Sequence, residues 1–329
     1  MFFMSLMLST LIVISSYSWM SMWMGLEINL LSFIPLMTNS KNMFPSEAAL
    51  KYFITQALAS NIFLFSIMLL LQFHTSMNQE FNTIMLMILN SALFMKLGAA
   101  PFHFWFPEVI SGLNWNNALI LLTWQKIAPM ILLIYSLNNM MYFSTIILMS
   151  CLIGGIQNFN QMDLRKILAY SSINHIGWMI TSFLGSSSVW LTYFMFYTMI
   201  SINIILIFKS LNIFYLNQLH SSMNFSKMIK FLFIINFLSL SGLPPFFGFL
   251  PKWLTLIDLI TSKFIMLSFL IILLTLISMY IYLRITFSSM TLLSTESLTR
   301  GITYLSFIMM IYNFITLSGM LGMTLIYLM

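Results

Sequence analysis

Apolar runs as long as a membrane crossing recur along nearly the whole chain, and this pattern excludes most soluble folds. A helix needs about 20 mainly apolar residues to cross the hydrocarbon of a bilayer. Only 6% of the 329 residues are charged, against roughly 25% in soluble domains. We therefore expect an all-α polytopic membrane protein with about eleven transmembrane helices. The runs cover residues 2–19, 22–38, 50–72, 82–105, 116–136, 141–159, 167–184, 188–209, 228–262, 265–286 and 302–328.

The ninth run is too long for one straight helix, and its stretch SGLPPFFGFLPKW interrupts any regular hydrogen-bond ladder. Lys and Arg collect in the loops on the side from which a membrane protein is inserted. If residues 228–262 form one broken crossing, only Lys263 falls on the other side, and the basic loop residues on the first side are Lys41, Lys51, Arg165, Lys166, Lys209, Lys227, Lys230, Arg284 and Arg300. Two crossings would move Arg284 and Arg300 to the wrong side. The charges favour one broken helix and an N-terminus on the positive side.

Three lysines remain inside the runs: Lys96, Lys126 and Lys252. A charge at the centre of a membrane helix costs about 2.5–3.5 kcal/mol on insertion scales. Lys96 and Lys126 lie more than two turns from the expected helix ends, so we expect that neither side chain reaches the interface. We interpret all three lysines as functional residues.

Two of these lysines lie in corresponding interrupted runs. Lys96 is followed by Gly98, Pro101 and Pro107, and Lys252 lies among Gly and Pro residues in the ninth run. Each would be the fourth helix of a five-helix unit, one covering residues 1–136 and the other 137–290. Because five is odd, the second unit would be inverted, as in inverted-repeat transporters. Residues 291–329 would add one C-terminal transmembrane helix.

Glu27 is the only carboxylate that falls inside a crossing by itself. It is either an interfacial residue beside Trp19 and Trp23 or, if it lies deeper, the counter-ion of Lys96.

Two histidines, His103 and His175, lie in apolar surroundings. Neither has a second ligand at metal-binding spacing, so we expect no metal site. Ser171 and Ser172 precede His175 and could hold water there, but a core histidine with satisfied hydrogen bonds explains the pattern equally well. We keep all four residues as secondary candidates.

The sequence contains no phosphate-binding loop, haem-ligand pair or cysteine cluster, so we expect no cofactor bound by this chain. The longest basic run is Arg165-Lys166, which argues against nucleic acid as a partner. Titratable groups in a low-dielectric interior are instead typical of proton transfer.

Four motifs together resemble the antiporter-like membrane subunits of respiratory complex I, over nearly the whole chain: KLGAAPFHFWFPEV at 96–109, LTWQKIAPM at 122–130, NQMDLRKILAYSSINHIGWM at 160–179 and LSLSGLPPFFGFLPKW at 238–253. The resemblance implies a shortened animal form that lacks the first three helices of bacterial members. It further implies the mitochondrial inner membrane, with the N-terminus on the matrix side.

The same resemblance implies a subunit of a proton-translocating NADH:ubiquinone reductase that performs no redox chemistry itself. NADH, FMN, iron–sulfur clusters and ubiquinone would be used in other subunits. Its partners would be other membrane-arm subunits, including further antiporter-like chains, and membrane lipids. The family pattern of one Glu and three Lys matches Glu27, Lys96, Lys126 and Lys252. Two alternatives stay open: a stand-alone cation/proton antiporter of the same fold, and a mainly structural membrane subunit whose buried lysines hold helices together.

Overall fold

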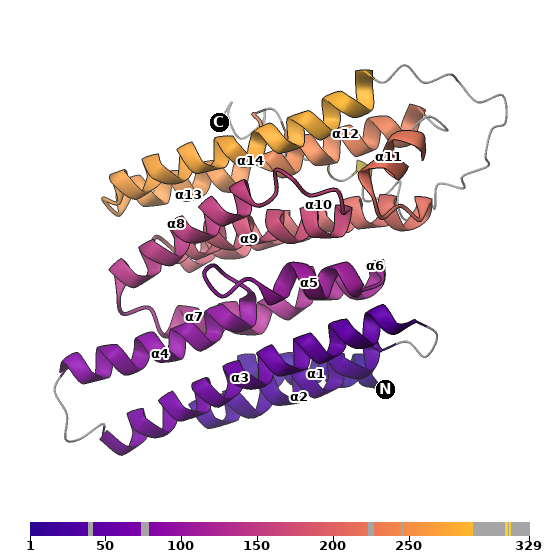
Figure 1. Cartoon of the computed structure of the whole chain (residues 1–329). Coiled ribbons are helices and arrows are strands. Elements are labelled where there is room, and N and C mark those ends of the chain that lie inside the picture. Colours follow the sequence, from indigo (N-terminus) through magenta and orange to yellow (C-terminus); the bar gives the residue numbers. More distant parts are fainter. Residues whose placement is uncertain are drawn as a thin grey trace. The chain divides into compact units, whose positions relative to one another are not determined.

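The computed structural model describes residues 1–38, 42–73, 79–222, 227–244 and 246–291, with residues 313, 314 and 316. Apart from an isolated bridge between Asp163 and Tyr215, the regular elements of this part are helices (Figure 1). They are α1 (Phe2–Ser15), α2 (Trp19–Met37), α3 (Met43–Phe73), α4 (Gln79–Leu97), α5 (Trp105–Gly112), α6 (Trp115–Leu122), the 3-10 helix η1 (Trp124–Lys126), α7 (Ile127–Tyr135), α8 (Met140–Ile156), α9 (Leu164–Phe183), α10 (Ser187–Leu211), α11 (Leu216–Ser222), α12 (Lys227–Ser241), α13 (Phe249–Thr261) and α14 (Ile265–Thr291). The predicted all-helical class is confirmed.

Five helical stretches of the described part are long and apolar enough to cross a membrane by themselves: Trp19–Met37, Met43–Gln72, Trp115–Tyr135, Ser187–Leu211 and Ile265–Ser289. Others are shorter apolar helices. The predicted last crossing, residues 302–328, lies outside the described residues apart from 313, 314 and 316. All-helical crossings are what a bilayer demands, because a helix satisfies its own backbone hydrogen bonds.

The chain divides into two compact units, Met1–Ser150 and Cys151–Met329, and the boundary falls inside α8. In unit 1, α2 packs against both α1 and α3, and α3 packs against α4 and α5 (Figure 1). Gly25 brings α1 and α2 into close contact, since a Cβ there would lie 2.6 Å from a methyl carbon of Val13. Small residues commonly allow such close helix packing in membranes.

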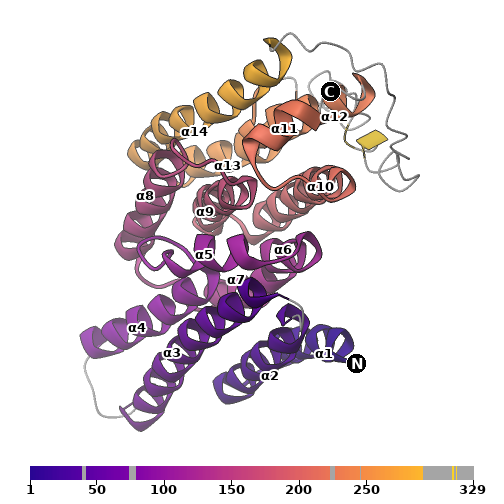
Figure 2. The same ribbon diagram turned by 45° about the vertical axis from the view of Figure 1, so that its right-hand side comes forward.

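In unit 2, α9 packs against α10 and α13, while α12 packs against α10 and α14 (Figure 2). Every residue of α9 is buried except Arg165, Lys166 and Tyr170. The polar side chains of α9 therefore face other helices and not lipid. Buried amide side chains also connect α10 to α12. Asn236 on α12 accepts a hydrogen bond from Asn203 on α10 at 3.5 Å and donates one to Asn313 at 2.7 Å.

Serine and threonine are compatible with these apolar helices because their hydroxyls bond to the same helix. Ser9 donates to the carbonyl of Leu6 at 2.8 Å, and Ser182 donates to that of Met179 at 2.6 Å. Such local bonds satisfy a hydroxyl without a partner on another helix. These residues therefore do not by themselves mark a functional site.

The helix interruptions agree with the sequence in the ninth run and correct it in the fourth and fifth runs. The ninth run breaks between Ser241 and Phe249, as predicted. The fourth run ends as a helix at Leu97, so Lys96 lies in the last turn of α4, and its expected mid-helix position is wrong. The reason is the turn that follows, where Gly98 adopts φ +74°.

The fifth run also differs from the expected single helix. It is divided into α6, η1 and α7, with Lys126 at the end of the 3-10 turn. Pro129 explains the interruption, because proline has no N–H to donate to the carbonyl four residues earlier and its ring crowds that carbonyl.

Candidate functional site

Lys96 and Lys126 line the same small cavity in the interior of unit 1. It is lined by residues of α2, α3, α4, α5, α6, η1 and α7: Leu26, Asn29, Leu30, Tyr52, Gln56, Lys96, Leu97, Trp105, Phe106, Leu121, Gln125, Lys126 and Pro129. About 20 Å³ is accessible to water centres. One water needs roughly 10–15 Å³ by that measure. Two basic side chains thus share a space with room for about one water molecule.

The two lysines are buried, with exposed fractions of 8% for Lys96 and 2% for Lys126. The Lys126 ammonium lies 5.8 Å from the centre of the Phe106 ring, on its face. Because buried charges are costly unless polar groups or water meet them, the polar lining of the cavity is what makes two lysines tolerable here.

The end of α4 beside Lys96 is held by side chains from two other helices. Gln56 on α3 donates to the carbonyl oxygen of Lys96 at 3.3 Å. The indole N–H of Trp105 donates to the carbonyl oxygen of Met95 at 3.0 Å. The last carbonyls of a helix lack intrahelical donors. The Lys96 carbonyl thus gains a donor from α3, and the Met95 carbonyl gains one from α5 in addition to the backbone N–H of Gly98 at 3.2 Å.

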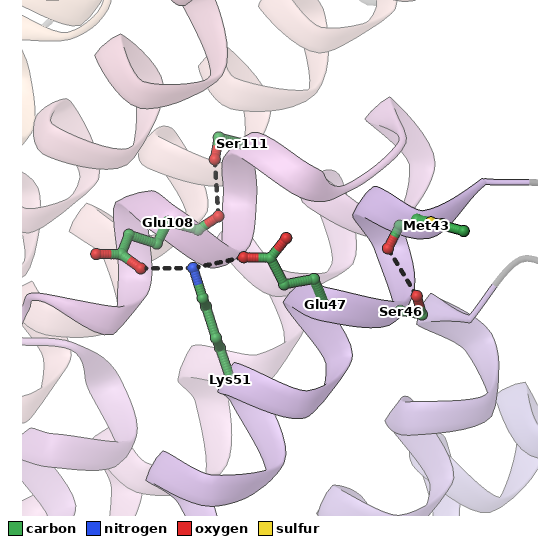
Figure 3. A network of polar contacts seen from close by, with 6 residues as sticks. All are labelled: Met43, Ser46, Glu47, Lys51, Glu108 and Ser111. Carbon is green, nitrogen blue, oxygen red and sulfur yellow. Dashed lines mark hydrogen bonds and ion pairs between the residues drawn. The ribbon is translucent and has the colours of Figure 1, made fainter.

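A salt-bridge network at the surface ties α3 to α5, the helix that carries Trp105 (Figure 3). The Lys51 ammonium lies 2.9 Å from both Glu47 and Glu108. A Cβ at Gly112 would lie 2.8 Å from the Cβ of Ala48, so α3 and α5 also pack closely. The position of α5 is therefore set by close packing, with exposed ion pairs in addition.

Glu27 is half-buried on α2 and is not among the cavity residues. None of the ion pairs between described residues joins Glu27 to Lys96. Leu26, Asn29 and Leu30 of α2 form the face toward the cavity. Since consecutive helical residues point in different directions, Glu27 lies beside this face.

Lys252 lies in a separate environment in unit 2, with an exposed fraction of 6%. Its ammonium donates to the carbonyl oxygen of Ser241 at 2.8 Å, at the end of α12. It also lies 5.6 Å from the centre of the Trp178 ring on α9. A cation at a helix C-terminus is favoured by the helix dipole, so the break between α12 and α13 provides a place for this charge.

Gly242 makes this place possible. It adopts φ +75°, and a Cβ there would lie 2.8 Å from both Cδ and Nζ of Lys252. A side chain at position 242 would therefore collide with the lysine as well as strain the backbone.

His175 belongs to a buried polar cluster on α9 and α10. Its Nδ1 lies 2.9 Å from the hydroxyl oxygen of Tyr193, and the centre of its ring lies 5.2 Å from that of Tyr197. The hydroxyls of Ser171 and Ser172 also donate to the carbonyls of Leu168 and Ala169. The structure thus brings His175 together with two tyrosines that we did not single out from the sequence.

His103 is also buried, at 1% exposure, but it lies in the loop between α4 and α5 and does not line the cavity. Its Nδ1 lies 3.3 Å from the carbonyl oxygen of Pro101. Within the described residues, no three His, Cys, Asp or Glu side chains cluster as metal ligands.

Four neutral polar residues of the cavity were missed from the sequence: Asn29, Tyr52, Gln56 and Gln125. Gln125 donates through Nε2 to Oδ1 of Asn29 at 3.0 Å. Their signal was an amide or hydroxyl within an apolar run, and it is weaker than that of a lysine because a neutral group costs less to bury.

The fold and these sites define a class of membrane proteins. The family model described as NADH:quinone oxidoreductase/Mrp antiporter, transmembrane, matches residues 16–278, which include Glu27 and all three buried lysines. The chain belongs to this family.

Curated relatives make the assignment narrower. A protein of Aedes aegypti named NADH-ubiquinone oxidoreductase chain 2 is 48% identical over 99% of this chain and 97% of the relative. The protein of the same name from Anopheles gambiae is 45% identical over the same shares of both chains. Within the larger family, the chain belongs with the NADH-ubiquinone oxidoreductase chain 2 proteins, and the resemblance seen in the sequence is confirmed.

Solved structures agree at the level of the fold. A chain of respiratory complex I from Thermus thermophilus superimposes with a TM-score of 0.86 at 23% identity, over 97% of this chain and 77% of that one. A chain of the Mrp complex from Dietzia superimposes with a TM-score of 0.76 at 15% identity, over 85% of this chain and 58% of that one.

Proposed function

We propose that Lys96 is the first buried proton carrier of this chain, with Glu27 as the charge that sets its proton affinity. The chain is a proton-translocating, antiporter-like membrane subunit of complex I, the NADH:ubiquinone oxidoreductase. Protons would pass from Lys96 to Lys126 and later to Lys252. The observation that carries this proposal is that Lys96 and Lys126 line one cavity with room for about one water molecule.

The chemistry of the cavity supports a transfer between the two lysines. A protonated lysine has donors only, whereas a neutral lysine can accept a proton through its nitrogen lone pair. Two ammonium groups near one small cavity repel each other, so the arrangement favours one proton on the pair. A change in the Glu27–Lys96 interaction would alter how that proton is shared.

Glu27 suits the role of a modulating charge because it is half-buried on a helix that lines the cavity, and none of the ion pairs between described residues joins it to Lys96. A direct buried pair would hold the lysine strongly in its charged form. Quinone reduction elsewhere in the complex would act on this interaction.

Several finer features belong to the same proposal. The crossings would form two inverted five-helix units, residues 1–136 and 137–290, followed by a C-terminal helix in 291–329. The chain would lie in the mitochondrial inner membrane with its N-terminus in the matrix, in contact with other antiporter-like subunits and with lipid. Glycine-associated breaks at Gly98 and Gly242, each beside a buried lysine, support the repeat.

The variant Lys96→Met tests the central role, because methionine has a similar length and no charge. In an assembled homologous complex we expect proton pumping per complex to fall about tenfold or more, since a proton-transfer group typically contributes 10²–10⁴-fold. Pumping would be measured as acidification driven by NADH oxidation, and assembly by native gel electrophoresis.

Lys263→Met is the matched control, because Lys263 lies between α13 and α14 and does not line the cavity of Lys96 and Lys126. We expect this variant to pump normally. Normal pumping by an assembled Lys96→Met complex would overturn the proposal. Failure of assembly with unchanged pumping per assembled complex would instead support a mainly structural role for the buried lysines.

A further inference from the structure

A hydrogen bond joins two neutral amides in the lining of the unit 1 cavity. Gln125 Nε2 donates to Asn29 Oδ1 at 3.0 Å, and both side chains line the cavity together with Lys96 and Lys126. We call these two side chains the amide crossbar. It connects α2, the helix of Glu27, to η1, the turn of Lys126.

Each end of the crossbar lies next to a charged group in sequence. Asn29 follows Glu27 by two residues and is only 4% exposed. Gln125 directly precedes Lys126, so the two share one 3-10 turn. The crossbar therefore gives the Glu27 helix a direct hydrogen bond to the turn that holds Lys126.

The crossbar cannot carry a proton, since amide side chains do not titrate near neutral pH. It still has hydrogen-bonding capacity toward the cavity, because the bond leaves the oxygen of Gln125 and the amino group of Asn29 for other partners. A buried water needs two to four polar partners. The crossbar would supply some of them for a water molecule between the two lysines.

We propose that Asn29 and Gln125 are positioning residues for proton transfer between Lys96 and Lys126. The crossbar holds the Lys126 turn in register with the Glu27 helix and orients the water through which the lysines communicate. This inference rests on the proposed function of the two lysines.

The test uses apolar replacements of similar shape, Asn29→Leu and Gln125→Met, singly and together. Replacing both partners of a buried hydrogen bond by such groups is often nearly neutral for stability. We expect the double variant to assemble, while its rate of NADH-driven proton pumping per assembled complex falls about two- to tenfold, the range that one net hydrogen bond supplies. The exchanged pair Asn29→Gln/Gln125→Asn keeps an amide at each end and should restore pumping.

Asn117→Leu is the matched control. Asn117 on α6 donates to the carbonyl of Leu36 on α2 at 2.7 Å. Like the crossbar, this bond holds α2 against a neighbouring helix, but Asn117 does not line the cavity. We expect normal pumping. The proposal is overturned if Asn117→Leu slows pumping as much as the crossbar variants. It is also overturned if the apolar double variant pumps normally. The same holds if neither the apolar double variant nor the exchanged-pair variant forms an assembled complex.

The Lys96→Met result separates the two proposals. If Lys96→Met abolishes pumping and the crossbar variants pump normally, only the role of the crossbar is wrong. If Lys96→Met itself pumps normally, the proposed function fails, and with it the inference that rests on it.

Discussion

At the scale of single residues, the three buried lysines have different surroundings. Lys96 and Lys126 share a cavity in unit 1, while Lys252 bonds to the end of a helix in unit 2. A charge that shares a cavity responds to the protonation of its neighbour, whereas one held by a carbonyl responds to the geometry of the backbone. Substitutions around the lysines should therefore have different consequences in the two units.

Gly242→Ala should displace the Lys252 ammonium from the carbonyl of Ser241. A Cβ there would lie 2.8 Å from Nζ at a backbone φ of +75°, and the left-handed conformation alone costs about 1–2 kcal/mol for a residue other than glycine. We expect lower pumping per assembled complex, together with a lower melting temperature of the complex.

Gly155→Ala is the control for this substitution. Its new Cβ would lie 3.5 Å or more from its neighbours in the same unit, which is ordinary van der Waals contact. A Gly242→Ala complex as active as the Gly155→Ala complex would contradict the steric argument.

At the scale of the elements, the end of α4 depends on donors from other helices. Trp105→Phe keeps an aromatic ring but removes the N–H that bonds to the carbonyl of Met95. The Met95 carbonyl keeps the backbone N–H of Gly98 as a donor, so the change removes one net hydrogen bond, worth about 0.5–1.5 kcal/mol. We expect a lower melting temperature of the purified complex, measured by differential scanning fluorimetry.

Trp23→Phe provides the comparison, because the Nε1 of Trp23 has no hydrogen-bond partner among the described residues. The same chemical change there should alter stability much less. Equal losses in the two variants would show that ring size, and not the hydrogen bond, determines the effect.

The helices themselves were largely predictable, because a long apolar run in a bilayer forms a helix, which satisfies its own backbone hydrogen bonds. The break around Gly242 was predictable from Pro and Gly, and the burial of Lys96 from the absence of any loop that could hold it. The 3-10 turn at Lys126 was missed although Pro129 follows it, since a lone proline is compatible with a merely kinked membrane helix. The crossbar was missed because nothing in sequence spacing relates Asn29 to Gln125.

At the scale of the whole molecule, the distribution of basic residues predicts which helix ends face the matrix. Engineered cysteines can test this, because the natural Cys151 is buried. Tyr17→Cys, at a fully exposed position between α1 and α2, should react with a membrane-impermeant maleimide from the intermembrane side. Met43→Cys, exposed at the start of α3, should react only from the matrix side. The reverse pattern on this chain would invert the proposed topology.

The burial of α9 has a consequence for how the protein is made. This 20-residue helix is absent from the stretches long and apolar enough to cross a membrane by themselves, since it carries serines, an asparagine and a histidine in its centre. A translocon that sorts helices by their solubility in lipid would retain α9 weakly. Because α9 packs against α10 and α13, we expect it to enter the bilayer together with these helices, which are synthesised after it.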